Sequence, residues 1–162
     1  MSGPGSSTVR PGVRIACDVG TVRIGVARSD ALGMLAVPLD AVPAGPDAVG
    51  SVCAVIDEWA AVDVYVGLPL HLSGAEGGAA ESARRWAQDL AERTTVPVRL
   101  IDERLSTVQA QRALRASGRS TRQSKSVIDS ASAVMVLQAV LDQEQRTDAA
   151  PGERVHVREE SS

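Results

Sequence analysis

The sequence predicts an α/β protein in which helices pack on a mixed five-stranded sheet. Three short apolar segments follow one another at the start of the chain, which is typical of a strand meander. After them, segments with the apolar spacing of helices alternate with two further strand-like segments. The chain has 162 residues, of which 44% are hydrophobic, so it can build one core but not two of ordinary size.

The first three strands are predicted over residues 13–19, 23–28 and 34–39, which are rich in apolar residues. A Gly-Thr turn at residues 20–21 separates the first two strands. The loop at residues 43–47 contains two prolines and ends the third strand. The chain therefore opens as a meander.

Two helices and two strands then alternate. Residues 49–60 and 79–90 carry apolar side chains at helical spacing. Residues 63–66 form a short strand that ends at a Gly-Leu-Pro turn, and residues 96–101 form the fifth strand. This alternation indicates helices that cross over between strands of the sheet.

Two further helices complete the prediction. A capping-box pattern opens a helix over residues 106–116. The last helix is predicted over residues 126–143 and is apolar on most sides, so we expect it to be buried. Residues 117–125 between them lack strongly apolar side chains and predict a mobile loop that becomes ordered on nucleic acid.

The expected domain organisation is a flexible arm over residues 1–12, one domain over residues 13–143 and a disordered acidic tail over residues 144–162. The arm has no apolar signal segment, and no apolar run is long enough to cross a membrane, so we expect a cytoplasmic protein. Two cysteines, Cys17 and Cys53, are too few for a disulfide framework or a cysteine-rich zinc site.

Aromatic residues are scarce and basic residues are clustered. The chain has no Phe, two Trp and one Tyr, so it cannot hold single-stranded bases mainly by stacking. The net charge is −3, yet residues 99–125 hold seven basic side chains against two acidic ones. This segment is a candidate phosphate-binding surface, and binding through it should weaken steeply with salt.

Carboxylates at the predicted ends of elements are the candidates for chemistry. Asp18 lies near the end of the first strand and points away from Ile15 and Cys17, and a charge there is costly unless it is paired or bound to a metal. Asp102 and Glu103 end the fifth strand, and Asp129 lies in the first turn of the last helix. Taken singly, these acids also fit plain structural roles, as a capping-box residue or as ion-pair partners of nearby arginines.

Acids that converge at one sheet edge repel one another and need a cation. The chain has only two histidines, so oxygen ligands for Mg²⁺ or Mn²⁺ are favoured over a soft-metal site. An acidic metal site beside a basic segment suggests phosphoryl transfer on a nucleic acid.

Four motifs, in order along residues 13–141, resemble the YqgF (RuvX) family. They are Asp-Val-Gly-Thr at 18–21 followed by Arg-Ile-Gly-Val-Ala at 23–27, Val-Gly-Leu-Pro-Leu at 66–70 with Gly74, Asp-Glu-Arg-Leu-Ser-Thr at 102–107, and Asp-Ser-Ala-Ser-Ala at 129–133. The resemblance implies an RNase H-like fold and a metal-dependent endonuclease that trims the 5′ end of pre-16S rRNA in ribosome biogenesis. The family was also proposed to resolve Holliday junctions, through its similarity to RuvC.

Carried onto this sequence, the resemblance makes Asp18, Glu103 and Asp129 the catalytic acids and the ligands of two Mg²⁺ or Mn²⁺ ions. Asp102 is expected on the opposite strand face from Glu103, where it supports the site without binding the same ion. His71 replaces a frequent Asn and is a candidate substrate contact. The candidate nucleic-acid-binding residues are Arg23, Arg104, Arg112, Arg115, Arg119, Arg122 and Lys125.

Two further positions depart from the family pattern. Val22 and Val127 stand where a Lys is frequent, which bears on substrate affinity more than on fold. Four functions remain open: a nuclease for an rRNA precursor or a pre-ribosomal particle, a dimeric resolvase for branched DNA, an actin-like ATPase, and a non-catalytic nucleic-acid-binding module. The chain is too short for the two-domain ATPase architecture, and the three acids argue against a non-catalytic module.

Overall fold

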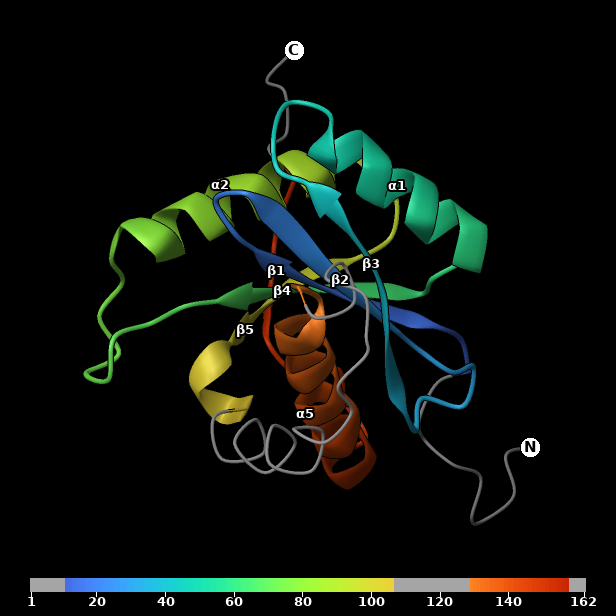
Figure 1. Cartoon of the computed structure of the whole chain (residues 1–162). Helices are drawn as coiled ribbons and strands as arrows, with labels where there is room; N and C mark the ends of the chain where they lie inside the picture. The colour runs from blue at the N-terminus through green and yellow to red at the C-terminus, as the bar shows by residue number, and fades with distance from the viewer. Residues whose placement is uncertain (1–10, 107–128, 158–162) are drawn as a thin grey trace, which may run out of the picture.

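The protein is described here from a computed structural model that covers residues 11–106 and 129–157. Its centre is a six-stranded mixed sheet with the strand order β3-β2-β1-β4-β5-β6 (Figure 1). The prediction of an α/β fold with a mixed sheet is confirmed, with one strand more than expected. The strands are β1 (Arg14–Val19), β2 (Arg23–Ser29), β3 (Ala36–Pro43), β4 (Asp63–Leu68), β5 (Val98–Asp102) and β6 (Glu153–Arg154).

The predicted meander forms one side of the sheet, and a parallel part forms the other. β1 pairs antiparallel with β2, and β2 pairs antiparallel with β3. On its other side β1 pairs parallel with β4, and β4 pairs parallel with β5. The carboxyl ends of β1, β4 and β5 therefore meet at one edge of the sheet, which is where α/β proteins commonly place their sites.

Helices cover both faces of the sheet. α1 (Ala48–Trp59) and α2 (Gly78–Arg93) lie on one face, and α5 (Ala131–Thr147) crosses the other (Figure 1). A short 3₁₀ helix, η1 (Glu103–Ser106), directly follows β5.

The face under α5 is built from small side chains at the central strands. Ala16 of β1 and Ala27 of β2 are fully buried there and pack with Ala133 and Leu137 of the helix. Alanines let the helix approach the sheet closely, because they add little depth to the strand surface. By strand alternation Asp18 shares this face with Ala16, which places its carboxylate near the beginning of α5.

β3 begins later than predicted, and two predicted elements lie outside the described residues. β3 begins at residue 36 rather than 34, because Asp30 Oδ1 accepts the backbone N–H groups of Met34 (2.7 Å) and Leu35 (3.1 Å) and holds both residues in the preceding loop. The predicted helix over residues 106–116 and the loop over residues 117–125 lie outside the described residues, apart from Ser106 at the end of η1.

The predicted disordered tail from residue 144 is wrong for its first part. α5 continues to Thr147, and residues 153–154 add a sixth strand to β5. Glu144 is buried and accepts a 2.8 Å hydrogen bond from the guanidinium of Arg14, which is fully buried at the start of β1. Glu144 is thus part of the core although its segment is acidic, because the buried guanidinium of Arg14, near the start of the chain, neutralises its charge.

We expect Glu144→Ala to lower the free energy of unfolding by about 3 kcal/mol or more, because it removes a carboxylate partner from a buried guanidinium. Urea denaturation followed by circular dichroism measures this change. Glu81→Ala is the matched control, since it removes the exposed partner of Arg85 on α2 and should leave the midpoint unchanged. Equal midpoints for the two variants would contradict the structural role of Glu144.

Candidate active site

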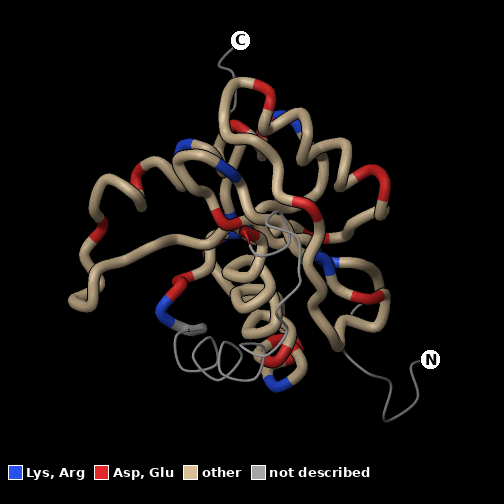
Figure 2. The backbone as a smooth tube through the Cα atoms, viewed as in Figure 1, with Lys and Arg blue, Asp and Glu red and all other residues tan. Residues whose placement is uncertain are grey.

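The predicted acids lie at the edge of the sheet where the parallel strands end. Asp18 is the last residue but one of β1, and Glu103 is the first residue of η1, directly after β5. Asp129 stands two residues before α5 rather than in its first turn. Figure 2 shows acidic and basic positions in direct succession where β5 passes into η1.

Asp18 and Glu103 form a hydrogen-bonded pair of carboxyl groups. Burial, the hydrogen bond to Asp18 and the charges of Asp18 and Asp102 together raise the pKa of Glu103 to about 8. Glu103 therefore holds its proton more firmly than an ordinary glutamate does. Two ionised carboxylates so close together repel each other unless a cation lies beside them, so this donor pair suits a hard divalent ion.

Gly67 of β4 makes the space that Glu103 occupies. A Cβ atom on Gly67 would lie 2.8 Å from Oε1 and 3.0 Å from Cγ of Glu103. The first distance is shorter than real Cβ contacts and the second is shorter than most of them, so a side chain at this position would make the Glu103 carboxylate shift. The glycine of the Gly-Leu-Pro motif therefore leaves room for the Glu103 carboxylate, in addition to ending the strand at a turn.

Ser130 and Gly25 fix the position of Asp129. The Ser130 hydroxyl accepts the backbone N–H of Val26 at 3.0 Å and donates to the carbonyl of Leu39 at 2.7 Å, so it joins the beginning of α5 to β2 and β3. Gly25 faces this contact, and a Cβ atom there would lie 2.6 Å from the Asp129 carbonyl oxygen. The chain before α5 therefore approaches β2 as closely as only a glycine allows.

We expect Gly25→Ala to lower the free energy of unfolding by about 1–3 kcal/mol, because backbone atoms must shift to admit the methyl group. Thermal or urea unfolding measures the loss. Gly78→Ala is the control, since Gly78 begins α2 and a Cβ atom there would meet nothing within 4 Å. A Gly25→Ala protein as stable as Gly78→Ala would contradict the close approach.

A hollow of about 380 Å³ opens beside the acids and is lined by Asp18, Gly20, Val22, Arg23 and Asp129. Within it, Arg23 Nη1 lies 3.3 Å from Asp129 Oδ2, and both side chains are partly exposed. Val22 is exposed as well, so the position where the family often has Lys presents an apolar side chain to the hollow.

The three predicted acids are not gathered around one point. Asp18 is paired with Glu103, whereas Asp129 contacts Arg23. Across residues 11–106 and 129–157, no group of three or more His, Cys, Asp or Glu side chains is close enough to hold a metal ion. The structure thus brings two acids together and places the third across the same hollow.

Asp102 and Arg104 form a separate pair. Arg104 donates to both carboxylate oxygens of Asp102 at 2.6–3.0 Å, and these hydrogen bonds lower the pKa of Asp102. Asp102 therefore turns to Arg104, whereas Glu103 turns to Asp18, which agrees with the opposite faces expected from strand alternation. Both described arginines with a predicted phosphate role, Arg23 and Arg104, are ion-paired to neighbouring acids, and Arg112, Arg115, Arg119, Arg122 and Lys125 lie outside the described residues.

His71 and the cysteines differ in their surroundings. His71 is exposed in the segment between β4 and α2, and its Nε2 lies against Gly77. Cys17 is free and buried on the face away from α5, and burial raises the pKa of its thiol. Cys53 is free and partly buried. Neither thiol belongs to the hollow.

Sequence reasoning did not single out Gly25, Gly67 and Ser130 as residues that build the site. A glycine inside a strand usually marks a close backbone approach, so Gly25 and Gly67 carried a usable signal. Ser130 carried none, because its two hydrogen bonds join segments about ninety to a hundred residues apart.

Comparison with known proteins shows which family the chain belongs to. The model of the RuvX family, described as a Holliday junction resolvase, matches residues 12–143. A protein of Thermobifida fusca is 48% identical over 155 residues, 91% of this chain and 98% of its own, and a protein of Streptomyces coelicolor is 46% identical over 152 residues, 92% of this chain and 91% of its own. Both bear the name "Putative pre-16S rRNA nuclease".

Among solved structures, RuvC of T. thermophilus in complex with a Holliday junction substrate matches with a TM-score of 0.58 and 19% identity, over 86% of this chain and 99% of that chain. This likeness shows the shared RNase H-like fold. In the described part of the chain, no helix is both long and apolar enough to cross a membrane.

Proposed function

The chain belongs to the RuvX family, and from this premise we propose that it is a divalent-metal-dependent nuclease that hydrolyses phosphodiester bonds in the precursor of 16S rRNA. The observation that carries the proposal is the contact between the Asp18 and Glu103 carboxyl groups at the sheet edge, beside the hollow that Asp18 and Asp129 line. The proposed substrate places the protein in the cytoplasm.

The residues present fit a hard cation. Asp18 and Glu103 would hold it once the Glu103 proton is released, and Asp129 would join them from across the hollow. A Mg²⁺ or Mn²⁺ ion, or a pair of them, supplies a more acidic water and stabilises charge on the phosphate. The proposed catalytic and metal-binding residues are thus Asp18, Glu103 and Asp129, and Asp102 supports them by holding Arg104.

Arg23 links substrate binding to the availability of Asp129. Its guanidinium lies at the hollow and is bound by Asp129 in the free protein. A substrate phosphate is a competing anion for the same guanidinium. When Arg23 binds the phosphate, the Asp129 carboxylate is freed toward Asp18 and Glu103. The basic segment over residues 99–125 would bind flanking phosphates, so binding should weaken steeply with salt.

The substrate is decided by a direct comparison. The purified protein is incubated with a 5′-extended 16S rRNA precursor and, in parallel, with a synthetic four-way DNA junction, each with Mg²⁺ or Mn²⁺ and each with EDTA as control. We expect metal-dependent cutting of the precursor to be the faster reaction.

A second candidate is resolution of DNA junctions, which the description of the matching family favours. Symmetric cutting of a junction needs two active sites and therefore a homodimer. Faster cutting of the junction by a dimer would replace the first proposal. Cutting of neither substrate, even when the precursor is presented in a pre-ribosomal particle, would reject both.

A further inference from the structure

The segment between β4 and α2, residues 69–77, runs beside the candidate active site. It leaves β4 just after Gly67, whose Cα faces the Glu103 carboxylate. We call these nine residues the 69–77 loop. Its two halves are joined to each other by a bridge between Leu70 and Glu76 and by hydrogen bonds between His71 and Ala75 (3.0 Å) and between Gly74 and His71 (2.8 Å).

The inner side of the loop is attached to η1. Arg104 Nη1 donates to the carbonyl oxygen of Leu72 at 3.3 Å, and the same guanidinium lies against Gly74. Arg104 is itself held by Asp102 and directly follows Glu103. The loop is therefore tied to the residue next to a proposed catalytic acid, while the Leu72 side chain is almost fully exposed.

The outer side of the loop is attached to α2 by Arg84. Arg84 Nε and Nη2 donate to the two carboxylate oxygens of Glu76 at 2.7 and 2.6 Å. The same guanidinium donates to both carboxylate oxygens of Glu153 in β6, at 3.0 and 3.2 Å. One arginine thus makes two bidentate ion pairs, an arrangement far more ordering than a single surface pair.

The segment that carries Glu153 is itself well attached. β6 pairs with β5, and Val155 donates its backbone N–H to the carbonyl of Val98 at 2.8 Å. Gln88 of α2 donates to the backbone carbonyl of His156 at 3.0 Å. Arg84 therefore connects the 69–77 loop to a fixed part of the sheet and not to a free chain end.

From these contacts we propose that Arg84 is a positioning residue: it holds the 69–77 loop through Glu76, is itself anchored to β6 through Glu153, and so fixes a loop that contacts the substrate beside Glu103. The claim that the loop contacts the substrate rests on the proposed nuclease function. The claim that Arg84 holds the loop in position does not, so the two claims are tested by different measurements.

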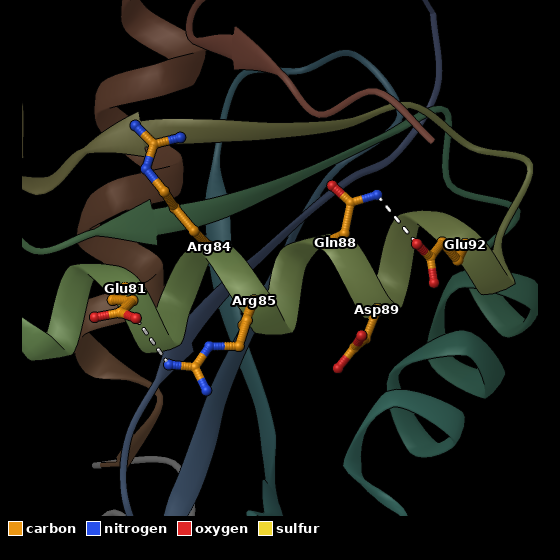
Figure 3. A pocket seen from close by; sticks show the side chains of 6 residues that line it. All are labelled: Glu81, Arg84, Arg85, Gln88, Asp89 and Glu92. Carbon is orange, nitrogen blue, oxygen red and sulfur yellow. Dashed lines mark hydrogen bonds and ion pairs between the residues drawn. The ribbon is translucent and has the colours of Figure 1, made fainter. Parts of the chain in front are cut away.

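The neighbouring arginine provides a matched control. Figure 3 shows Arg84 and Arg85 leaving α2 in different directions, with Arg85 directed to Glu81 on the same helix. The side chains of Arg85 and Glu81 pair with each other across one helix turn at 3.1 Å, whereas the Arg84 side chain pairs with Glu76 of the loop and Glu153 of β6. Arg85→Gln therefore removes a guanidinium of the same helix without loosening the loop.

Hydrogen–deuterium exchange on the full-length protein tests the positioning. We expect the backbone amides of His71 and Gly74 to exchange about fivefold faster in Arg84→Gln, because the loop opens more often. Glu153→Gln should accelerate the same amides, although it lies about eighty residues away in sequence. Amides of Cys17 and Val66 in the central strands β1 and β4 should stay unchanged in every variant and show that the fold is intact.

Unchanged exchange in Arg84→Gln, or equal acceleration in Arg85→Gln, would overturn the positioning role. Acceleration by Arg84→Gln without acceleration by Glu153→Gln would overturn the link to the C-terminal strand. Cleavage kinetics then test the substrate part: we expect Arg84→Gln to raise KM about fivefold with kcat nearly unchanged. A loosened loop with unchanged KM would show that the loop is no part of the substrate-binding face.

Discussion

Asp18→Asn is expected to lower the rate of metal-dependent RNA cleavage by about three orders of magnitude or more, because it removes a charged ligand from the proposed ion site. The same variant should keep its fold. Asparagine has nearly the same shape as aspartate, and the change removes a charge that lies beside a second acid. Single-turnover cleavage of the rRNA precursor measures the rate, and thermal unfolding measures the stability.

The control for this prediction is an acid that lies elsewhere. Asp57 is exposed on α1, which covers the other face of the sheet. Asp57→Asn should therefore retain the full cleavage rate. Cleavage by Asp18→Asn at the wild-type rate would show that Asp18 is no part of the catalytic site.

Strand alternation was enough to place the acids correctly on the sheet. Ile15 and Cys17 pack under α1 and α2, so Asp18 lies on the α5 face. Leu100 also packs under α1 and α2, so Asp102 lies on that face, whereas Glu103 follows the strand in η1 and has a different partner. Alternation works at these positions because each strand is buried on both faces, so a shift by one residue would bury a carboxylate among apolar side chains.

Sequence patterns could not place the chain after residue 143. That stretch is polar and acidic, which is typical of a disordered tail. Its order comes from distant partners: Glu144 binds Arg14, and Glu153 binds Arg84. Local composition carries no information about such pairs, because the two members lie about seventy and a hundred and thirty residues apart.

The sequence also could not predict which of the acids contact one another. The motifs predicted three carboxylates at one edge, but not that Glu103 would pair with Asp18 while Asp129 turned to Arg23. Which acid pairs with which depends on side-chain contacts of a few ångströms. Gly67 and Gly25 permit these contacts because they lack a side chain. The Glu103 carboxylate approaches Gly67 and the Asp129 backbone approaches Gly25, and a methyl group would block either approach.

Glu103→Gln is expected to make the metal-free protein more stable than wild type at pH 8 and above, but not at pH 5. The pKa of Glu103 is raised to about 8 in the folded protein, above its ordinary value in an unfolded chain. The folded state thus keeps a proton that the unfolded state has lost, so the free energy of unfolding falls as the pH rises toward 8. A neutral glutamine removes this loss.

The gain should be of the order of 1–2 kcal/mol at pH 8, once screening by solvent at a half-buried site is allowed for. Thermal unfolding of both proteins between pH 5 and pH 9 in EDTA measures it, and the difference in melting temperature should grow through this range and then level off. A difference that is independent of pH would show that Glu103 is already ionised below pH 5.

The same two proteins show whether a cation replaces the proton. With saturating Mn²⁺ at pH 8, wild type should gain stability, because the ion binds the folded carboxylate pair and not the dispersed carboxylates of the unfolded chain. Glu103→Gln should gain much less, since half of the pair is gone. The order of stabilities should therefore reverse: the variant is the more stable protein without the ion, and wild type is the more stable protein with it. Such a reversal is expected when two acids are placed together to bind a cation, although they lower the stability of the metal-free protein. The measurement needs no nucleic acid. An unchanged order with Mn²⁺ would remove Glu103 from the proposed ligands even if the protein proves to be a nuclease.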